Sequence, residues 1–218
     1  MSMVYVIFAV SSIALWLVPS PKQIDLLEQV MTIQPTPLSK PLSLSSYVSF
    51  TPHITLASIP GFSITEISAL QGSLDSLLKA SEALHVRFRA LTVGGHYFRS
   101  VYLAIHPTSE LVTLHEHICI ALRNAMQSNV NHDGVQPKAP MFPHMSLCYI
   151  ADEDAEERER MAMALRHSGK IEETEGSVRL RCEGGETLDG FNGEDVWIVR
   201  CQGRPDEWEV LQKIHLSV

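Results

Sequence analysis

Two short segments of the sequence repeat one arrangement of side chains that is suited to acid–base chemistry. Residues 52–56 read Pro-His-Ile-Thr-Leu, and residues 143–147 read Pro-His-Met-Ser-Leu. At average residue usage, such a pentad arises at a given position by chance on the order of once in 10⁵. Two copies in a chain of 218 residues therefore indicate a shared functional site.

The histidine and the hydroxyl residue of each pentad are spaced to meet one ligand. Residues i and i+2 of a strand share a face, so His53 points the same way as Thr55, and His144 the same way as Ser146. Two histidines can act as acid and base in an in-line displacement at phosphorus, and the hydroxyls can donate to the phosphate oxygens. We expect the pentads to face each other across a cleft and to handle a phosphate. This scheme requires no metal and no cofactor.

Other candidate residues carry weaker patterns. His96 and Arg99 flank a predicted turn, where Arg99 could help to neutralise a phosphate, although a solvated arginine is the simpler interpretation. His115 and His117 are two positions apart on a predicted helix, so they face different directions and make a poor metal pair. The tryptophans are interpreted as core aromatics: Trp16, Trp197 and Trp208.

The elements that must position the pentads alternate between strands and helices. The hairpin predicted over 85–105 and the closing run of strands do not suit a doubly wound fold, so we predict an α+β fold. The loop, strand and helix around each pentad suggest an internal duplication. We therefore expect two pseudo-symmetric lobes of antiparallel sheet plus helices around a central cleft. Periodicity predicts helices over 22–33, 63–83, 109–127 and 153–168. The helix over 153–168 is expected to have a solvated charged face. Strands are predicted over 13–18, 53–57, 85–93, 98–105, 177–182, 196–201 and 207–211.

The composition is that of a globular protein with an acidic surface. Apolar residues make up 45% and charged residues 19% of the chain, and the net charge is −8. This charge argues against broad binding to a nucleic-acid backbone, so we expect a small-molecule substrate and no stable nucleic-acid complex. The cysteines form no CxxC pair, so they predict buried thiols rather than a zinc site: Cys119, Cys148, Cys182 and Cys201.

The N-terminal residues 1–18 are mostly apolar and carry no charged side chain, which reaches the lower length limit of a membrane span. A basic region typical of a signal peptide is lacking. We interpret residues 13–18 as a buried strand, residues 13–218 as a single bilobal domain and residues 1–12 as an extension of open role. Membrane association is expected only through residues 1–18. We expect a cytoplasmic monomer, with Golgi or other endomembrane association as the alternative.

The paired His-x-Thr/Ser segments resemble the signature of the two-histidine phosphoesterase superfamily. Within it, the chain is similar to the fungal cyclic phosphodiesterases. Members of that group begin close to residue 13, so residues 1–11 are extra. The resemblance is carried by 13–19 (IALWLVP), 52–56 (PHITL), 95–103 (GHYFRSVYL), 143–149 (PHMSLCY) and 196–211 (VWIVRCQGRPDEWEVL).

The resemblance implies a bilobal α+β fold with a water-filled cleft. It implies hydrolysis of 2′,3′-cyclic nucleotides to 2′-phosphates, and of ADP-ribose 1″,2″-cyclic phosphate, a by-product of tRNA splicing, to ADP-ribose 1″-phosphate. His53 and His144 would be the proton donor and acceptor, in either order. Thr55 and Ser146 would bind phosphate, and Tyr149 would contact the substrate.

The implied role of Tyr149 conflicts with a regular strand, which would place Cys148 on the ligand face and Tyr149 in the core. We therefore expect the strand to end or bend near Cys148, turning the thiol away and letting Tyr149 reach the cleft. Two other functions remain: an RNA-end-processing enzyme of the superfamily and a non-catalytic nucleotide-binding module. The acidic charge and the lack of a basic, aromatic-rich stripe speak against the first, and the intact histidines and hydroxyls speak against the second.

Overall fold

The computed structural model describes residues 12–32, 41–60, 64–127 and 142–217. They form an α+β fold in which a seven-stranded antiparallel sheet has the strand order β1-β2-β5-β4-β3-β9-β10. Its strands are β1 (Ser12–Pro19), β2 (Ile54–Pro60), β3 (Leu84–His96), β4 (Arg99–Ile105), β5 (His144–Cys148), β9 (Gly190–Cys201) and β10 (Glu209–His215). The other elements are α1 (Pro21–Met31), α2 (Ile64–Lys79), α3 (Ser109–Gln127), α4 (Glu157–His167) and the small sheet β6 (Ile171–Thr174), β7 (Ser177–Arg181) and β8 (Thr187–Leu188).

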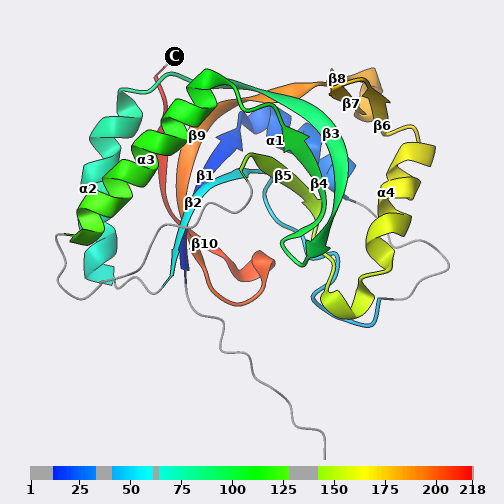
Figure 1. The fold of residues 1–218 in the computed structure, drawn as a ribbon, viewed down its shortest axis with the longest axis horizontal. Coiled ribbons are helices and arrows are strands. Elements are labelled where there is room, and N and C mark those ends of the chain that lie inside the picture. Colours follow the sequence, from blue (N-terminus) through cyan, green and yellow to red (C-terminus); the bar gives the residue numbers. More distant parts are fainter. Residues whose placement is uncertain (1–11, 33–40, 61–63, 128–141, 218) are drawn as a thin grey trace, which may run out of the picture.

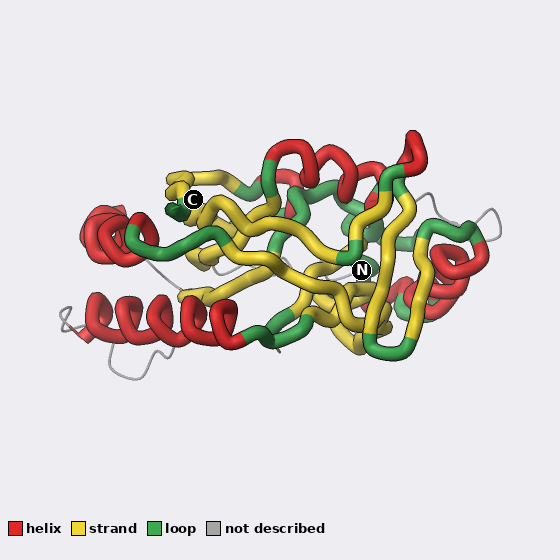
Figure 2. The backbone as a smooth tube through the Cα atoms, turned by 90° about the horizontal axis from the view of Figure 1, so that it is seen from above, coloured by secondary structure: helices red, strands yellow, loops and turns green. Residues whose placement is uncertain are grey.

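The large sheet curls onto itself because β9 pairs with β1 as well as with β3 and β10. Figure 1 shows α2 and α3 on one flank of this arch, and α4 with the small sheet on the other. Figure 2, seen from above, shows the strands running between helices at the two ends. The hollow side of the curved sheet is therefore left between the two helical flanks.

The two pentads lie on β2 and β5, which are neighbouring antiparallel strands in the middle of the sheet. They therefore lie side by side on one continuous sheet rather than on separate sheets facing each other. The apolar residues of each pentad point away from the hollow side into the core, as alternation predicts. Ile54, Leu56, Met145 and Leu147 are all buried there. Burial of side chains of this size stabilises the fold by about 1.5–3 kcal/mol each. Because these residues must point into the core, the alternating histidines must point to the opposite face of the sheet.

The helices form where the sequence supplies matching periodicity and ends. Pro21 begins α1, where the missing N–H would have no partner in any case. In α3 the apolar residues recur every three or four positions and are buried against the core, as expected for a helix covering a sheet: Leu111, Leu114, Ile118 and Leu122. None of the helices in the described ranges is long and apolar enough to cross a membrane.

Residues 12–19 form β1, between β2 and β9, so the prediction of a buried strand there is confirmed. They cannot at the same time belong to a free membrane-spanning segment. Residues 1–11, which make up all but the last residue of the predicted extension, lie outside the described part of the chain.

Several predictions about the bounds of elements were wrong in detail. The second helix ends at Lys79, not at 83, and the last helix begins at Glu157, not at 153. The last strand, predicted over 207–211, spans Glu209–His215. The strand predicted over 196–201 begins earlier, at Gly190, and a Cβ at Gly190 would lie 1.8 Å from the carbonyl oxygen of Val86 on β3. The close approach of two strands, rather than chain reversal, explains that glycine.

The charged segment 153–168 is not simply a solvated face, because Asp154, Glu157 and Arg158 are buried. Asp154 accepts hydrogen bonds from the backbone amides of Leu42 and Ser43 and from the Ser46 hydroxyl. Burial raises the pKa of Asp154, but these three hydrogen bonds outweigh it and hold the pKa below its ordinary value. The carboxylate therefore fastens the loop that leads to the first pentad onto the segment that follows the second.

Candidate active site

The strand register brings the two pentads together with their order reversed. Ile54 is paired with Met145, and this register, continued by one residue in each direction, sets His53 opposite Ser146 and Thr55 opposite His144. All four side chains line one cavity of about 370 Å³, a size typical of small-ligand sites. The cavity thus presents two imidazoles and two hydroxyls related by an approximate two-fold axis.

Tyr149 also lines this cavity, and the expected bend near Cys148 is confirmed. Val101 of β4 pairs with Cys148, whereas the next residue, Tyr102, pairs with Ser146, so one extra residue bulges from β5. A bulge of this kind reverses the alternation of side chains. Cys148 accordingly lies in the core, where burial raises the pKa of its thiol to about 12, and Tyr149 takes the cavity face.

His53 is held in a defined position and protonation state. Its Nδ1–H donates to the carbonyl oxygen of Thr51 at 2.6 Å. Its ring stacks on Trp16, with centroids 3.7 Å apart and planes at 10°. Burial lowers the pKa of His53 to about 4, opposed by the Thr51 hydrogen bond and assisted by the nearby charge of His144. The imidazole is therefore neutral at pH 7, and because a carbonyl can only accept, the unprotonated nitrogen is Nε2.

The second pentad is tied to the tip of the β3–β4 hairpin. The Ser146 hydroxyl donates to the carbonyl oxygen of Phe98 at 2.9 Å. Burial raises the pKa of Tyr149, and a hydrogen bond with the Ser146 side chain opposes this rise only in part. Tyr149 is therefore a neutral phenol that stacks on Phe50, with ring centroids 4.0 Å apart.

Gly94 permits the hairpin to close tightly. A Cβ at this position would lie 2.0 Å from the Arg99 carbonyl oxygen, whereas a Cβ at Gly95 would meet nothing within 4 Å. We expect Gly94→Ala to lower the free energy of unfolding by about 1–3 kcal/mol, and kcat/KM about tenfold because the hairpin carries the Phe98 carbonyl. Thermal unfolding and steady-state kinetics would measure both effects. Gly95→Ala is the matched control, and equal effects of the two substitutions would contradict this account of the hairpin.

Several residues that line the cavity were not predicted as site residues. Trp16 and Trp208, interpreted from the sequence as core aromatics, both border it, whereas Trp197 is buried beside Trp16 in a small apolar cluster. Trp16 faces the cavity because it shares one alternating face of β1 with Ser12 and Ala14, which also line the cavity, whereas Leu15 and Leu17 on the other face lie in the core. Both faces of β1 are apolar, so its sequence does not show which face meets the cavity. Phe98 of the hairpin also lines the cavity, as do His96 and Arg99, the weaker candidates of the sequence analysis.

The other predicted candidates lie elsewhere. His115 stacks on Phe142, and His117 lies at a separate surface cavity, so neither joins the pentads. The described part of the chain holds no group of three His, Cys, Asp or Glu residues placed to bind a metal ion.

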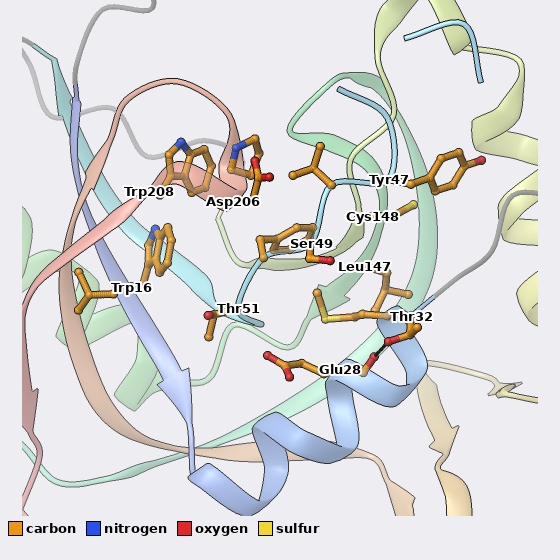
Figure 3. A pocket seen from close by; sticks show the side chains of 15 residues that line it. Trp16, Glu28, Thr32, Tyr47, Ser49, Thr51, Leu147, Cys148, Asp206 and Trp208 are labelled. Atoms are coloured by element: carbon orange, nitrogen blue, oxygen red, sulfur yellow. Dashed lines mark hydrogen bonds between the residues drawn. The ribbon is translucent and has the colours of Figure 1, made fainter. Parts of the chain in front are cut away.

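A second cavity of about 520 Å³ adjoins the first and shares Trp16 and Trp208 with it (Figure 3). Its polar groups are different, since it is lined by the carboxylates of Glu28 and Asp206 and by no histidine. Burial and the neighbouring Asp25 raise the pKa of Glu28. An acidic cavity is a poor place for a phosphate, so the pentad cavity is the better candidate for phosphate chemistry.

Comparisons with known proteins agree with this geometry. The chain is 28% identical to a 2′,3′-cyclic-nucleotide 3′-phosphodiesterase of Yarrowia lipolytica, over 91% of this chain and 96% of that protein. Its fold matches the crystal structure of Escherichia coli LigT complexed with ATP, with a TM-score of 0.52, 14% identity and coverage of 96% and 98% of the two chains. A structure from Thermus thermophilus, TT0787, matches with a TM-score of 0.52, 16% identity and coverage of 94% and 97%. Residues 11–216 match the family model described as "cyclic phosphodiesterase-like protein", and the chain belongs to that family.

Proposed function

We propose that the protein hydrolyses 2′,3′-cyclic nucleotides to nucleoside 2′-phosphates without a metal ion, using His53 and His144 as base and acid. The observation that carries this proposal is the reversed pairing of the two pentads, by which each contributes an imidazole and a hydroxyl to one cavity. This arrangement suits an in-line displacement, because the attacking and leaving oxygens lie on opposite sides of phosphorus.

His53 is the group suited to act as base. It is neutral at pH 7, and its Nδ1–H is engaged by Thr51, so Nε2 is left to take a proton from water. The water oxygen forms a bond to phosphorus while the bond between phosphorus and O3′ breaks. His144 gives a proton to the departing O3′, and the product keeps its phosphate on O2′.

The hydroxyl residues hold the phosphate during this exchange. Thr55 lies opposite His144 and Ser146 opposite His53, so each can donate to a non-bridging oxygen beside the reacting bonds. Ser146 donates to the Phe98 carbonyl in this structure, so its hydroxyl must turn to reach a phosphate. Tyr149, a neutral donor next to Ser146, contacts the substrate.

The wider setting of this activity is also proposed. The resemblance to fungal cyclic phosphodiesterases supports ADP-ribose 1″,2″-cyclic phosphate from tRNA splicing as a second substrate, converted to ADP-ribose 1″-phosphate. A cavity of about 370 Å³ suits a small molecule rather than a folded nucleic acid. We propose a monomer in the cytoplasm, with any membrane attachment made through the N-terminal residues.

The proposal is tested by incubating the protein with 2′,3′-cyclic AMP in excess EDTA and identifying the product by chromatography. We expect undiminished turnover and adenosine 2′-phosphate alone, because the acid protonates O3′. Formation of the 3′-phosphate, or loss of activity in EDTA, would contradict the proposed mechanism. Faster hydrolysis of an oligonucleotide ending in a cyclic phosphate would instead favour an RNA-end-processing enzyme.

A further inference from the structure

The β3–β4 hairpin brings to the catalytic cavity a positive charge that the pentads do not use. His96 and Arg99 are paired across the two-residue turn Tyr97-Phe98. Side chains of such a cross-strand pair share a face, and both line the cavity that holds the catalytic histidines. Arg99 thus reaches the phosphate site from a separate element.

Arg99 differs from the other described arginines in lacking both an acidic partner and full exposure. Within the described residues, no carboxylate lies within ion-pair distance of its guanidinium, although the side chain is half-buried. A guanidinium is always charged, and partial removal from water leaves it in need of an anion. The other described arginines fall into two groups. Some pair with Asp or Glu: Arg158, Arg160, Arg166, Arg181, Arg200 and Arg204. The rest are exposed: Arg87, Arg89, Arg123 and Arg179.

The turn that carries Arg99 is fixed by three hydrogen bonds to other segments. The Phe98 carbonyl accepts from Ser146 at 2.9 Å, and the Ser100 hydroxyl accepts from the Ile150 amide at 2.8 Å. The Tyr97 hydroxyl donates to the Ser45 carbonyl at 2.9 Å. The backbone that carries Arg99 is therefore held in place before a ligand arrives, which reduces the entropy lost on binding.

We propose that Arg99, with His96 beside it, forms a second anion subsite that binds a phosphate other than the one being hydrolysed. The inference rests on the proposed function, in which two histidines and two hydroxyls already serve the cyclic phosphate. The cavity then favours cyclic phosphodiesters that carry an additional phosphate, as ADP-ribose 1″,2″-cyclic phosphate does in its diphosphate. A 2′,3′-cyclic nucleotide without a 5′-phosphate leaves the subsite empty.

The test compares two substrates that differ by one phosphate: adenosine 2′,3′-cyclic phosphate and its 5′-phosphorylated form. We expect Arg99→Gln to lower kcat/KM for the 5′-phosphorylated substrate by about 10–100-fold, mainly through KM, as for loss of a charged hydrogen bond. The other substrate should change by less than about threefold. Arg99→Lys should restore part of the loss, and Arg89→Gln, an exposed arginine on β3, should change neither substrate.

Equal losses on the two substrates, or no loss on either, would overturn the subsite. A wild-type protein that turns over neither substrate would contradict the proposed function instead. Calorimetric titration with inorganic diphosphate then gives a second readout of the subsite that does not depend on turnover. Binding that Arg99→Gln weakens and Arg89→Gln leaves unchanged supports it, and binding that is absent or unaffected by Arg99→Gln overturns it.

Discussion

Replacing His53 or His144 by alanine is expected to lower kcat/KM for 2′,3′-cyclic AMP by about 10²–10⁴-fold, the range for loss of a positioned general acid or base. In the proposed mechanism each histidine serves a different end of the displacement, so neither can substitute for the other. The double variant should be little worse than either single variant, because both act in one step. Steady-state kinetics of the three variants would measure this.

The control for these variants is His167→Ala, which removes an exposed histidine at the end of α4, outside the cavity. It should retain wild-type kinetics. Both pentad histidines are largely buried, with 5% and 9% of their surface exposed, so thermal unfolding must show that the variants remain folded. A folded His53→Ala or His144→Ala protein with full activity would refute the two-histidine mechanism.

The fold class and the pentad residues that face the cavity were predictable because they follow from local pattern. Alternation along β2 and β5 fixes the facing of His53 and His144, and the repeat shows that the two belong together. The adjacency of the pentads was not predictable, because strand order is set by long-range pairing. Ile54 pairs with Met145 although two helices and a hairpin separate them along the chain.

The bulges mark a second limit of prediction from sequence. A register shift in β5 carries Tyr149 to the cavity, and an extra residue in β2 sets Thr55 opposite Trp16 of β1. Neither shift has a glycine or a proline at the irregular position as a signal. The bend at Tyr149 was expected only because the family resemblance assigned that residue a role, and nothing comparable pointed to Trp16. A bulge is decided by the fit between strands, so a single strand's sequence does not reveal it.

Trp16 provides the second prediction, since its ring covers one face of His53 and contributes to the burial that lowers the pKa of His53. We expect Trp16→Leu to lower kcat/KM by about 10²-fold at pH 8, because the imidazole is no longer held in line with the water. The substitution should also admit water to His53 and raise its pKa from about 4 toward the ordinary value of 6.5. The acid limb of the kcat/KM profile would then move to higher pH, so the loss would be larger at pH 5 than at pH 8.

The stability of the protein should change with pH for the same reason. A histidine whose pKa is lower when folded than when unfolded stabilises the fold fully above the unfolded value, and this contribution is lost as the pH falls from about 6.5 toward 4. Trp16→Leu should flatten that dependence. The matched control is Trp197→Leu, which truncates a neighbouring tryptophan of the same buried cluster without touching His53. Trp197→Leu should lower the free energy of unfolding while leaving the acid limb of the kcat/KM profile in place. If the acid limb moves equally in both variants, Trp16 acts on His53 only through general packing.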